Sequence, residues 1–157
     1  MNPKVYIETT IVSYLTAWPS QNLIVAAHQQ ITSSWWRNRR SDFELFASEL
    51  VFQEAGIGDK EMVQQRLETL KALSRLETTE AALFLAEALV KQGPLPQKAA
   101  EDALHIAVAV ENGMDYLLTW NCKHLANASM RYKIDEICRK MGYVPVIICT
   151  PEELLEE

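Results

Sequence analysis

The sequence predicts one α/β domain, residues 1–157, in which helices flank both faces of a mostly parallel central sheet. Two observations predict this class. Short apolar runs rich in β-branched residues alternate with longer segments of helical periodicity along the whole chain, and this alternation is typical of parallel strands joined by helices. The 157 residues are also enough to bury one core. They contain no repeat, linker or low-complexity tract that would divide the domain.

Five short segments have the composition of strands. They are residues 4–7, 44–47, 75–77, 116–119 and 144–149. Lys4–Ile7 is short, apolar and β-branched, as a buried strand should be. Pro145 has no backbone N–H, so we expect the last strand to lie at an edge of the sheet or to begin at this proline.

Seven helices are predicted around these strands. Their approximate ranges are 9–15, 22–40, 48–56, 59–73, 79–92, 97–112 and 129–141. Ser and Thr side chains often cap helix N-termini, so we expect caps at Thr9 or Thr10 and at Thr79, and a helix that opens at Ser48 or Glu49. Leu23 belongs to the apolar pattern of 22–40, and the inner face of 59–73 is expected to include Leu67 and Leu70.

The charge of the chain restricts how it could bind nucleic acid. Fifteen basic and 21 acidic residues give a formal net charge of −6. Binding to phosphates by general electrostatics requires an excess of Lys and Arg. Either nucleic acid is not the partner, or several acids are concentrated in one site where cations offset them. Composition leaves both possibilities open.

The remaining bulk features favour a reducing cytoplasm. No secretory signal precedes the first strand, and no apolar run approaches the roughly 20 residues of a membrane span. The odd number of cysteines argues against a disulfide framework. Cys122 and His124, with Cys138 further on, match no common zinc spacing, so we expect isolated and mostly buried thiols.

Four oxygen-bearing side chains are expected at one end of the sheet. Glu8 directly follows the first strand, and Asn121 follows the strand at 116–119 after one tryptophan. Glu54 lies on the helix after the second strand, and Asp102 lies early in the helix 97–112. Ligands of parallel α/β sheets collect beyond the carboxyl ends of the strands. Each residue alone also has an ordinary explanation, such as a helix first turn or a turn residue.

The surroundings of Asp102 favour a functional role. Ala103 and Ile106 belong to the buried face of its helix, and Asp102 shares the edge of that face with His105, three residues on. A half-buried carboxylate needs a partner such as a cation. His105 could orient that carboxylate, or it could be a buried histidine satisfied by backbone groups; the sequence leaves both readings open.

Four ordered motifs carry a resemblance to a known family. They are Val5–Thr10 (VYIETT), Ser48–Glu54 (SELVFQE), Asp102–Ala109 (DALHIAVA) and Tyr116–Asn121 (YLLTWN). In order and separation they resemble the PIN-domain family, which includes the VapC-type toxins of bacterial toxin–antitoxin pairs. The resemblance covers about the whole chain.

The resemblance implies a parallel sheet flanked by helices, a Mg²⁺- or Mn²⁺-dependent endoribonuclease, a homodimer and an antitoxin protein as partner. It places the first three acidic positions of the family on Glu8, Glu54 and Asp102, and the last motif on Thr119 and Asn121. This chain departs from the family twice, because the family usually has Asp at the positions of Glu8 and Asn121. Asparagine keeps an oxygen but loses a charge, which should weaken a second metal ion.

Hard divalent cations prefer oxygen ligands, so these residues suit metal-assisted hydrolysis of RNA. We expect Glu8 and Asp102 to hold the main ion directly and Glu54 to assist through water or a second ion. Asn121 would orient a water or ligand, and Thr119 would support the loop. The main alternative is a PIN-fold protein with weak or lost metal binding that acts by binding RNA or protein. A phosphoacceptor domain of the receiver type fits less well, because only one acid follows the first strand.

Basic residues that could contact RNA occur in two places. Arg37, Arg39 and Arg40 adjoin Trp35 and Trp36, although a packed helix end whose arginines favour the helix dipole explains them better. Around the last motif, possible flanking residues are Lys123, His124, Arg131 and Lys133. None of these is included in the predicted site.

Overall fold

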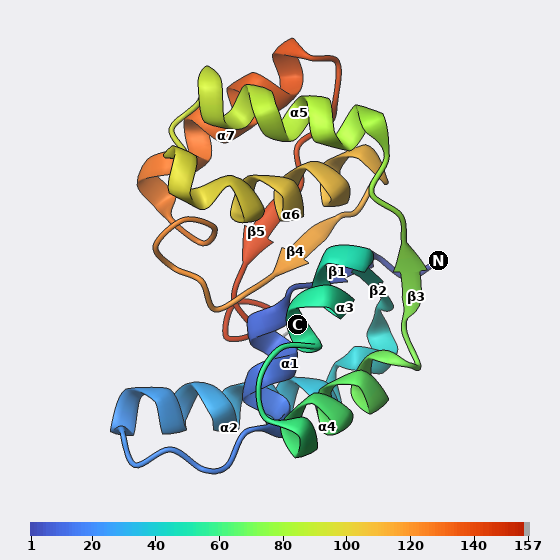
Figure 1. Cartoon of the computed structure of the whole chain (residues 1–157), viewed down its shortest axis with the longest axis vertical. Coiled ribbons are helices and arrows are strands. Elements are labelled where there is room, and N and C mark those ends of the chain that lie inside the picture. Colours follow the sequence, from blue (N-terminus) through green and yellow to red (C-terminus); the bar gives the residue numbers. More distant parts are fainter. Residues whose placement is uncertain (156–157) are drawn as a thin grey trace.

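A computed structural model describes residues 1–155 (Figure 1). Its five strands are β1 (Lys4–Ile7), β2 (Glu44–Ser48), β3 (Ser74–Leu76), β4 (Tyr116–Leu118) and β5 (Ile147–Cys149). They form one sheet in the order β3-β2-β1-β4-β5, and every strand pair in the described chain is parallel. The expected α/β class is confirmed.

Seven α-helices connect the strands within the described residues. They are α1 (Thr9–Thr16), α2 (Leu23–Asn38), α3 (Glu49–Ala55), α4 (Lys60–Leu70), α5 (Glu80–Lys91), α6 (Ala100–Glu111) and α7 (Ala128–Lys140). Short 3₁₀ turns at Arg40–Asp42 and Gln97–Ala99 precede β2 and α6. The predicted helix 97–112 therefore begins with a 3₁₀ turn, which follows Pro96.

The order of the strands separates the helices into two layers. From β1 to β3 the chain steps toward one edge of the sheet, and after β3 it crosses back to β4 and proceeds to the other edge. Right-handed crossovers in opposite directions place their helices on opposite faces. Figure 1 shows this arrangement, with α5, α6 and α7 together on one side and α1 to α4 on the other.

β1 lies in the centre of the sheet and anchors the core. Val5, Tyr6 and Ile7 are fully buried, and so are Leu117 and Leu118 on the neighbouring β4. Parallel strands that are covered on both faces are expected to be apolar throughout, and these two strands fit that rule. Among the buried residues of β1, the hydroxyl of Tyr6 is the polar group, and it reaches the candidate site described below.

The helix caps follow the sequence at most positions. Ser48 accepts a hydrogen bond from the Val51 N–H, and Thr79 accepts one from the Ala82 N–H, as predicted. The predicted cap at Thr9 or Thr10 is wrong, because Glu8 is the N-cap residue of α1 and both threonines lie inside the helix. Their hydroxyls bond to glutamates of the site instead.

Some apolar residues predicted by periodicity to be buried are exposed. Leu23, at the start of α2, is 86% exposed, and Leu67 on α4 is also exposed, whereas Leu70 is buried. The last strand starts at Ile147, later than predicted, so Pro145 precedes it and β5 forms an edge of the sheet. Among residues 1–155, no helix combines the length and apolarity needed to traverse a lipid bilayer.

Candidate active site

The candidate site lies where the carboxyl ends of β1 and β4 meet. From β1 the chain proceeds to β2 on one side, while β4, on the other side, is reached only after β3. Such a reversal point is where open α/β sheets bind ligands. The Glu8 N–H continues the pairing by donating to the Leu118 carbonyl at 3.1 Å. The first residue after β1 is thereby held beside the first residue after β4, Thr119.

Glu8 is a buried carboxylate held by neutral donors. It is only 4% exposed. The hydroxyls of Thr119 and Thr10 donate to Oε1 at 2.6 and 2.5 Å. Within the described chain, Oε2 has no hydrogen-bond partner, and no Lys or Arg forms an ion pair with Glu8. A carboxylate at this depth requires a compensating cation.

Glu54 reaches the same place from α3. Its Oε1 accepts the Thr9 hydroxyl at 2.5 Å and lies 2.9 Å from Nε2 of His105 on α6. The other ring nitrogen of His105, Nδ1, lies 2.7 Å from the Tyr6 hydroxyl, which in turn lies 2.6 Å from the Ser48 hydroxyl. A buried network therefore runs from the N-cap of α3 through β1 and α6 back to Glu54.

The charges of Glu54 and His105 stabilise each other. Burial alone would raise the pKa of Glu54, but the hydrogen bond and positive charge of His105 and the Thr9 hydroxyl outweigh burial and lower it. Burial alone would lower the pKa of His105, but the hydrogen bond to Glu54 and the charges of Glu8, Glu54 and Asp102 raise it. Glu101, hydrogen-bonded to Glu54, has a raised pKa.

Asp102 lies at the edge of the site and is held by the segment after β4. Its Oδ1 accepts the Asn121 side-chain amide at 3.0 Å, and its Oδ2 lies 3.2 Å from Nδ1 of His124. Oδ1 of Asn121 accepts the His124 backbone N–H at 3.2 Å, which closes the turn. Asn121 therefore orients Asp102 and His124 together.

The Thr119–Trp120–Asn121 segment is hydrogen-bonded to α1, including its N-cap residue Glu8, and to α2. Thr119 donates to Glu8, while the Trp120 backbone N–H donates to the Thr10 hydroxyl at 2.9 Å. The Trp120 indole N–H donates to the Thr32 hydroxyl at 2.6 Å, and its ring stacks on His28 with centroids 3.9 Å apart. Both of these residues lie on α2, so α2 supports the loop that carries Asn121.

The donor set fits a divalent cation. Ligand atoms of Glu8, Glu54 and His105 all lie within 4.8 Å of one another, and the group combines two carboxylates with one imidazole. Asp102 is not part of this close cluster within the described residues. A cation among these atoms would neutralise two carboxylates whose cationic neighbour within residues 1–155 is His105.

All five predicted site residues, Glu8, Glu54, Asp102, Thr119 and Asn121, lie at this end of the sheet. The metal-binding roles assigned to them remain predictions. Sequence reasoning did not place Tyr6, Ser48 or His124 in the site. The hydroxyl of Tyr6 in an otherwise apolar strand was the available signal for the first, and the short spacing of His124 from Asn121 was the signal for the last.

The arginines of 37–40 lie away from the site. They directly precede β2, at the amino ends of the strands, whereas the acidic cluster lies at the carboxyl ends. Trp35 is fully buried, and the Arg40 guanidinium lies over the Trp36 ring, 4.9 Å from its centroid. The packed helix end explains this cluster better than a contact with RNA.

The described residues contain no zinc site built on cysteine. The three cysteines are free; Cys122 is exposed, and Cys138 and Cys149 are buried. Burial raises the pKa of Cys138 to about 11 and that of Cys149 to about 12. Two of the three thiols are therefore buried, as expected, and Cys122 is exposed.

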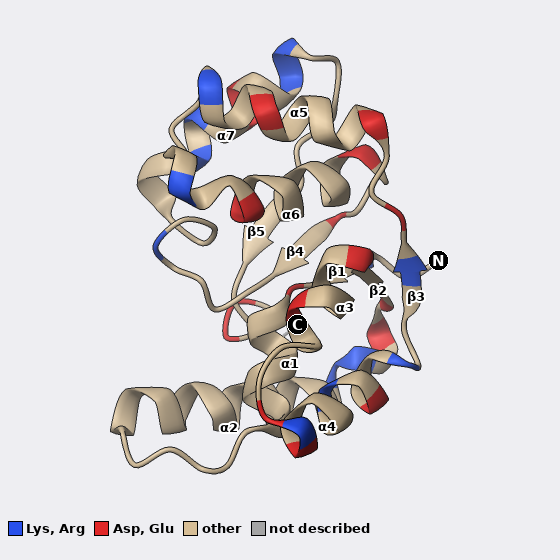
Figure 2. Cartoon of the chain, viewed as in Figure 1, with Lys and Arg blue, Asp and Glu red and all other residues tan. Residues whose placement is uncertain are grey.

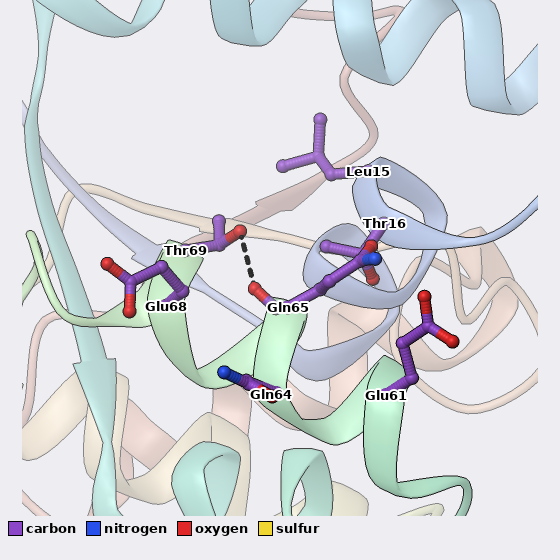
Figure 3. A pocket seen from close by; sticks show the side chains of 7 residues that line it. All are labelled: Leu15, Thr16, Glu61, Gln64, Gln65, Glu68 and Thr69. Carbon is purple, nitrogen blue, oxygen red and sulfur yellow. Dashed lines mark hydrogen bonds between the residues drawn. The ribbon is translucent and has the colours of Figure 1, made fainter.

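A separate groove lies between α1 and α4. It has a volume of about 620 Å³ and none of the predicted site residues lines it (Figure 3). The lining residues are Leu15, Thr16, Glu61, Gln64, Gln65, Glu68 and Thr69. This groove is open and polar, and its two glutamates, Glu61 and Glu68, supply suitable control positions for variants of the site.

Comparisons with known proteins address the fold. No family model matches the sequence, and no curated protein matches it significantly. Among solved structures, the chain is similar to VapBC2 from Rickettsia felis bound to a DNA fragment from their promoter, with a TM-score of 0.59 and 14% identity over 94% of this chain and 98% of that one. The chain has a PIN-like fold.

A second solved structure supports the same conclusion. VapC20 from Mycobacterium tuberculosis, a toxin that cleaves the sarcin–ricin loop, matches with a TM-score of 0.58 and 13% identity over 76% of this chain and 91% of that one. At these identities the likeness establishes the PIN-like fold and no more. The chemistry has to be argued from the site itself.

Proposed function

We propose that this protein is a divalent-metal-dependent endoribonuclease that uses Mg²⁺ or Mn²⁺. The observation that carries the proposal is the buried Glu8 carboxylate, which faces Glu54 and His105 at the reversal point of a PIN-like sheet. Phosphodiester hydrolysis requires a cation and a positioned water at one place, and a buried acidic cluster open to ligand suits that requirement.

Each residue of the site would have a distinct role in binding the ion. A bound Mg²⁺ or Mn²⁺ ion would lower the pKa of a water and offset charge on the phosphate. Glu8 and Glu54 would bind the ion, oriented by the hydroxyls of Thr119 and Thr9. Asp102, at the edge of the cluster, completes the acidic set by binding the ion directly, as the sequence predicts, or through water.

Asn121 and His124 would hold the Asp102 carboxylate in place. The Asn121 amide holds one Asp102 oxygen and leaves the other to His124. The position that usually adds an acid in the family therefore adds a hydrogen-bond donor here. One ion is thus the expected number, because the charge for a second is missing.

RNA needs positive charge near such a site, despite the net charge of −6. Lys and Arg gather over α7 and the neighbouring ends of α5 and α6 (Figure 2). α7 carries Arg131 and Lys133 in its first half, close in sequence to the loop that holds Lys123 and His124. This side of the molecule is the favoured approach for RNA.

We further propose that the protein is the toxin of a toxin–antitoxin pair in the cytoplasm and forms a homodimer. The support is the fold shared with VapBC2 and with the VapC20 toxin. Co-expression with the protein encoded next to its gene tests this pairing. A stable complex that suppresses RNA cleavage is expected, and an unaffected cleavage rate would argue against the pairing.

The activity itself is tested with RNA and Mn²⁺. We expect the wild type to cleave structured RNA in Mn²⁺ or Mg²⁺ and to lose cleavage in EDTA. Asp102→Asn and Glu8→Gln should each lower the rate at least about 100-fold while keeping the fold, because each removes a charge from the site. Glu61→Gln, in the α1–α4 groove, is the matched control and should keep full activity. Unchanged cleavage by both site variants would refute the assignment.

A second function has one observation in its favour. Asn121 donates a hydrogen bond to Asp102 and brings no negative charge to the site. With one carboxylate fewer, the site would bind the metal ion too weakly for catalysis. The protein would then act by binding RNA or protein. Calorimetric titration of Mn²⁺ separates the two. Binding by the wild type that is lost in Glu8→Gln supports the nuclease. Absence of binding, together with RNA capture without cleavage, supports the binding protein.

A further inference from the structure

We propose that His105 is itself a metal ligand, so that the site of Glu8, Glu54 and His105 is a mixed oxygen–nitrogen site that selects a transition-metal ion such as Mn²⁺ over Mg²⁺. This proposal deepens the proposed function and rests on it in one respect, that the acidic cluster binds a divalent ion. The proposal adds to the proposed function a ligand that is not an acid, His105, and the class of ion that the site prefers.

His105 is built to point one nitrogen into the cluster. Its side chain is 1% exposed and packs against the Tyr6 ring in an edge-to-face arrangement, with ring centroids 5.7 Å apart. Nδ1 is used by the Tyr6 hydroxyl at 2.7 Å, and that hydroxyl is also engaged by Ser48. Nε2 therefore faces the carboxylates. Metal-binding histidines usually have one nitrogen on a hydrogen-bond partner in this way and the other on the ion.

The spacing of the donor atoms already suits an ion. Neighbouring ligands of a six-coordinate ion with bonds of about 2.1 Å lie about 3.0 Å apart. Nε2 of His105 and Oε1 of Glu54 are 2.9 Å apart, and ligand atoms of all three residues lie within 4.8 Å. An ion bound to both atoms would replace the hydrogen between Nε2 and Oε1.

Glu8 supplies a carboxylate oxygen that is free to bind the ion. Both hydrogen-bond donors to its carboxylate, Thr10 and Thr119, bind Oε1, which leaves Oε2 without a partner among residues 1–155 although the side chain is almost fully buried. Asp102, by contrast, has a donor on each oxygen. The unpartnered Glu8 oxygen and the Nε2 atom of His105 together define a site centred on Glu8, Glu54 and His105, with Asp102 outside the close cluster of ligand atoms.

The identity of the third ligand determines the preference among ions. Mg²⁺ binds oxygen almost exclusively, whereas imidazole is a good ligand for first-row transition metals. Replacing one oxygen ligand by an imidazole therefore disfavours Mg²⁺ relative to Mn²⁺. We expect Mg²⁺ to displace bound Mn²⁺ only when the Mg²⁺ concentration is more than about tenfold higher than the Mn²⁺ concentration. Changes in the groups around a bound metal typically alter its affinity by factors of this size.

The test is pulsed electron paramagnetic resonance of Mn²⁺ added to the full chain grown with ¹⁵N-histidine. A direct Mn–nitrogen bond gives a strong ¹⁵N coupling in the wild type, and this needs no variant. His105→Gln should abolish the coupling and weaken Mn²⁺ binding. His124→Gln is the matched control, because it removes the imidazole on Asp102; it should leave the coupling intact.

Each outcome assigns the ligand. Mn²⁺ bound without a ¹⁵N coupling, or a coupling lost in His124→Gln and kept in His105→Gln, overturns the proposal while leaving the nuclease standing. A His105 coupling in a protein that cleaves no RNA supports the proposal and refutes the nuclease. Absence of Mn²⁺ binding by the wild type at millimolar concentration overturns the proposal.

Discussion

The pairing of Glu54 with His105 makes the site sensitive to pH when no ion is bound. Two carboxylates, the buried Glu8 and the partly buried Glu54, meet one buried imidazole. Mutual interaction lowers the pKa of Glu54 below its ordinary value of 4.5 and raises that of His105 above 6.5. In the metal-free protein a proton on His105 therefore partly neutralises the two acids.

This arrangement predicts two limits to the stability of the metal-free protein. A raised histidine pKa stabilises the fold fully below about pH 6.5, and this contribution is lost as pH rises through the folded value. A lowered glutamate pKa stabilises the fold above about pH 4.5, and this contribution is lost as pH falls. Urea unfolding in EDTA should thus show falling stability from pH 6 toward pH 9. His105→Gln should flatten that alkaline decline; an identical decline in the variant would show that another group causes it.

At the scale of elements, the hydrogen bond between Ser48 and Tyr6 ties the start of α3 to the centre of the sheet. Ser48 caps α3 through the Val51 N–H, and its hydroxyl also lies 2.6 Å from that of Tyr6. Glu54 is in the last turn of the same short helix. The orientation of α3, and with it the position of Glu54, therefore depends on one hydroxyl at its other end.

A double-mutant cycle tests this coupling. Ser48→Ala removes a helix cap and leaves the buried Tyr6 hydroxyl with fewer partners, so we expect a loss of about 1–3 kcal/mol in the free energy of unfolding. Tyr6→Phe should lose a similar amount, and the double variant should lose less than the sum, because both remove one network. Thr79→Ala, which removes the cap of α5, is the control. It should cost about 1 kcal/mol and be additive with Tyr6→Phe.

The elements were predictable where local chemistry is sufficient. The strands and helices follow from periodicity, and Ser48 and Thr79 cap their helices as their residue types predict. Thr9 and Thr10 were wrongly predicted to be caps, because their hydroxyls donate to Glu54 and Glu8 instead. These contacts depend on the geometry of the site and not on the local sequence of the helix. Periodicity likewise cannot tell that Leu23, at the free end of α2, lies beyond the reach of the core.

The site was predictable as a set of residues but not as a geometry. The rule that ligands gather at the carboxyl ends of parallel strands, together with the family resemblance, brought Glu8, Glu54, Asp102, Thr119 and Asn121 together. It could not show that His105 faces Glu54 while His124 faces Asp102. Those pairings depend on how α6 and the loop after β4 are rotated against the sheet, which is a property of packing.

At the scale of the whole molecule, the site joins the two helical layers. Glu54 comes from the layer of α1 to α4, while Asp102 and His105 come from α6 in the opposite layer, and Glu8 and Thr119 follow the two central strands (Figure 1). The like charges of Glu8, Glu54 and Asp102 weaken this junction, and a cation that binds there would strengthen it. Metal binding should therefore stabilise the complete fold.

This reasoning predicts a metal-dependent melting temperature. A ligand that binds only the folded state at about 100 times its Kd adds about 2.7 kcal/mol, which corresponds to roughly 5–10 °C in a domain of this size. Scanning calorimetry with saturating Mn²⁺ should show such a rise for the wild type and for Glu61→Gln, whose glutamate lies in the separate groove. Glu8→Gln should melt near or above the metal-free wild type and respond little to Mn²⁺, because it lacks one buried charge and one ligand. An equal rise in Glu8→Gln would mean that Mn²⁺ binds elsewhere, and the junction of the two layers would then not be the metal site.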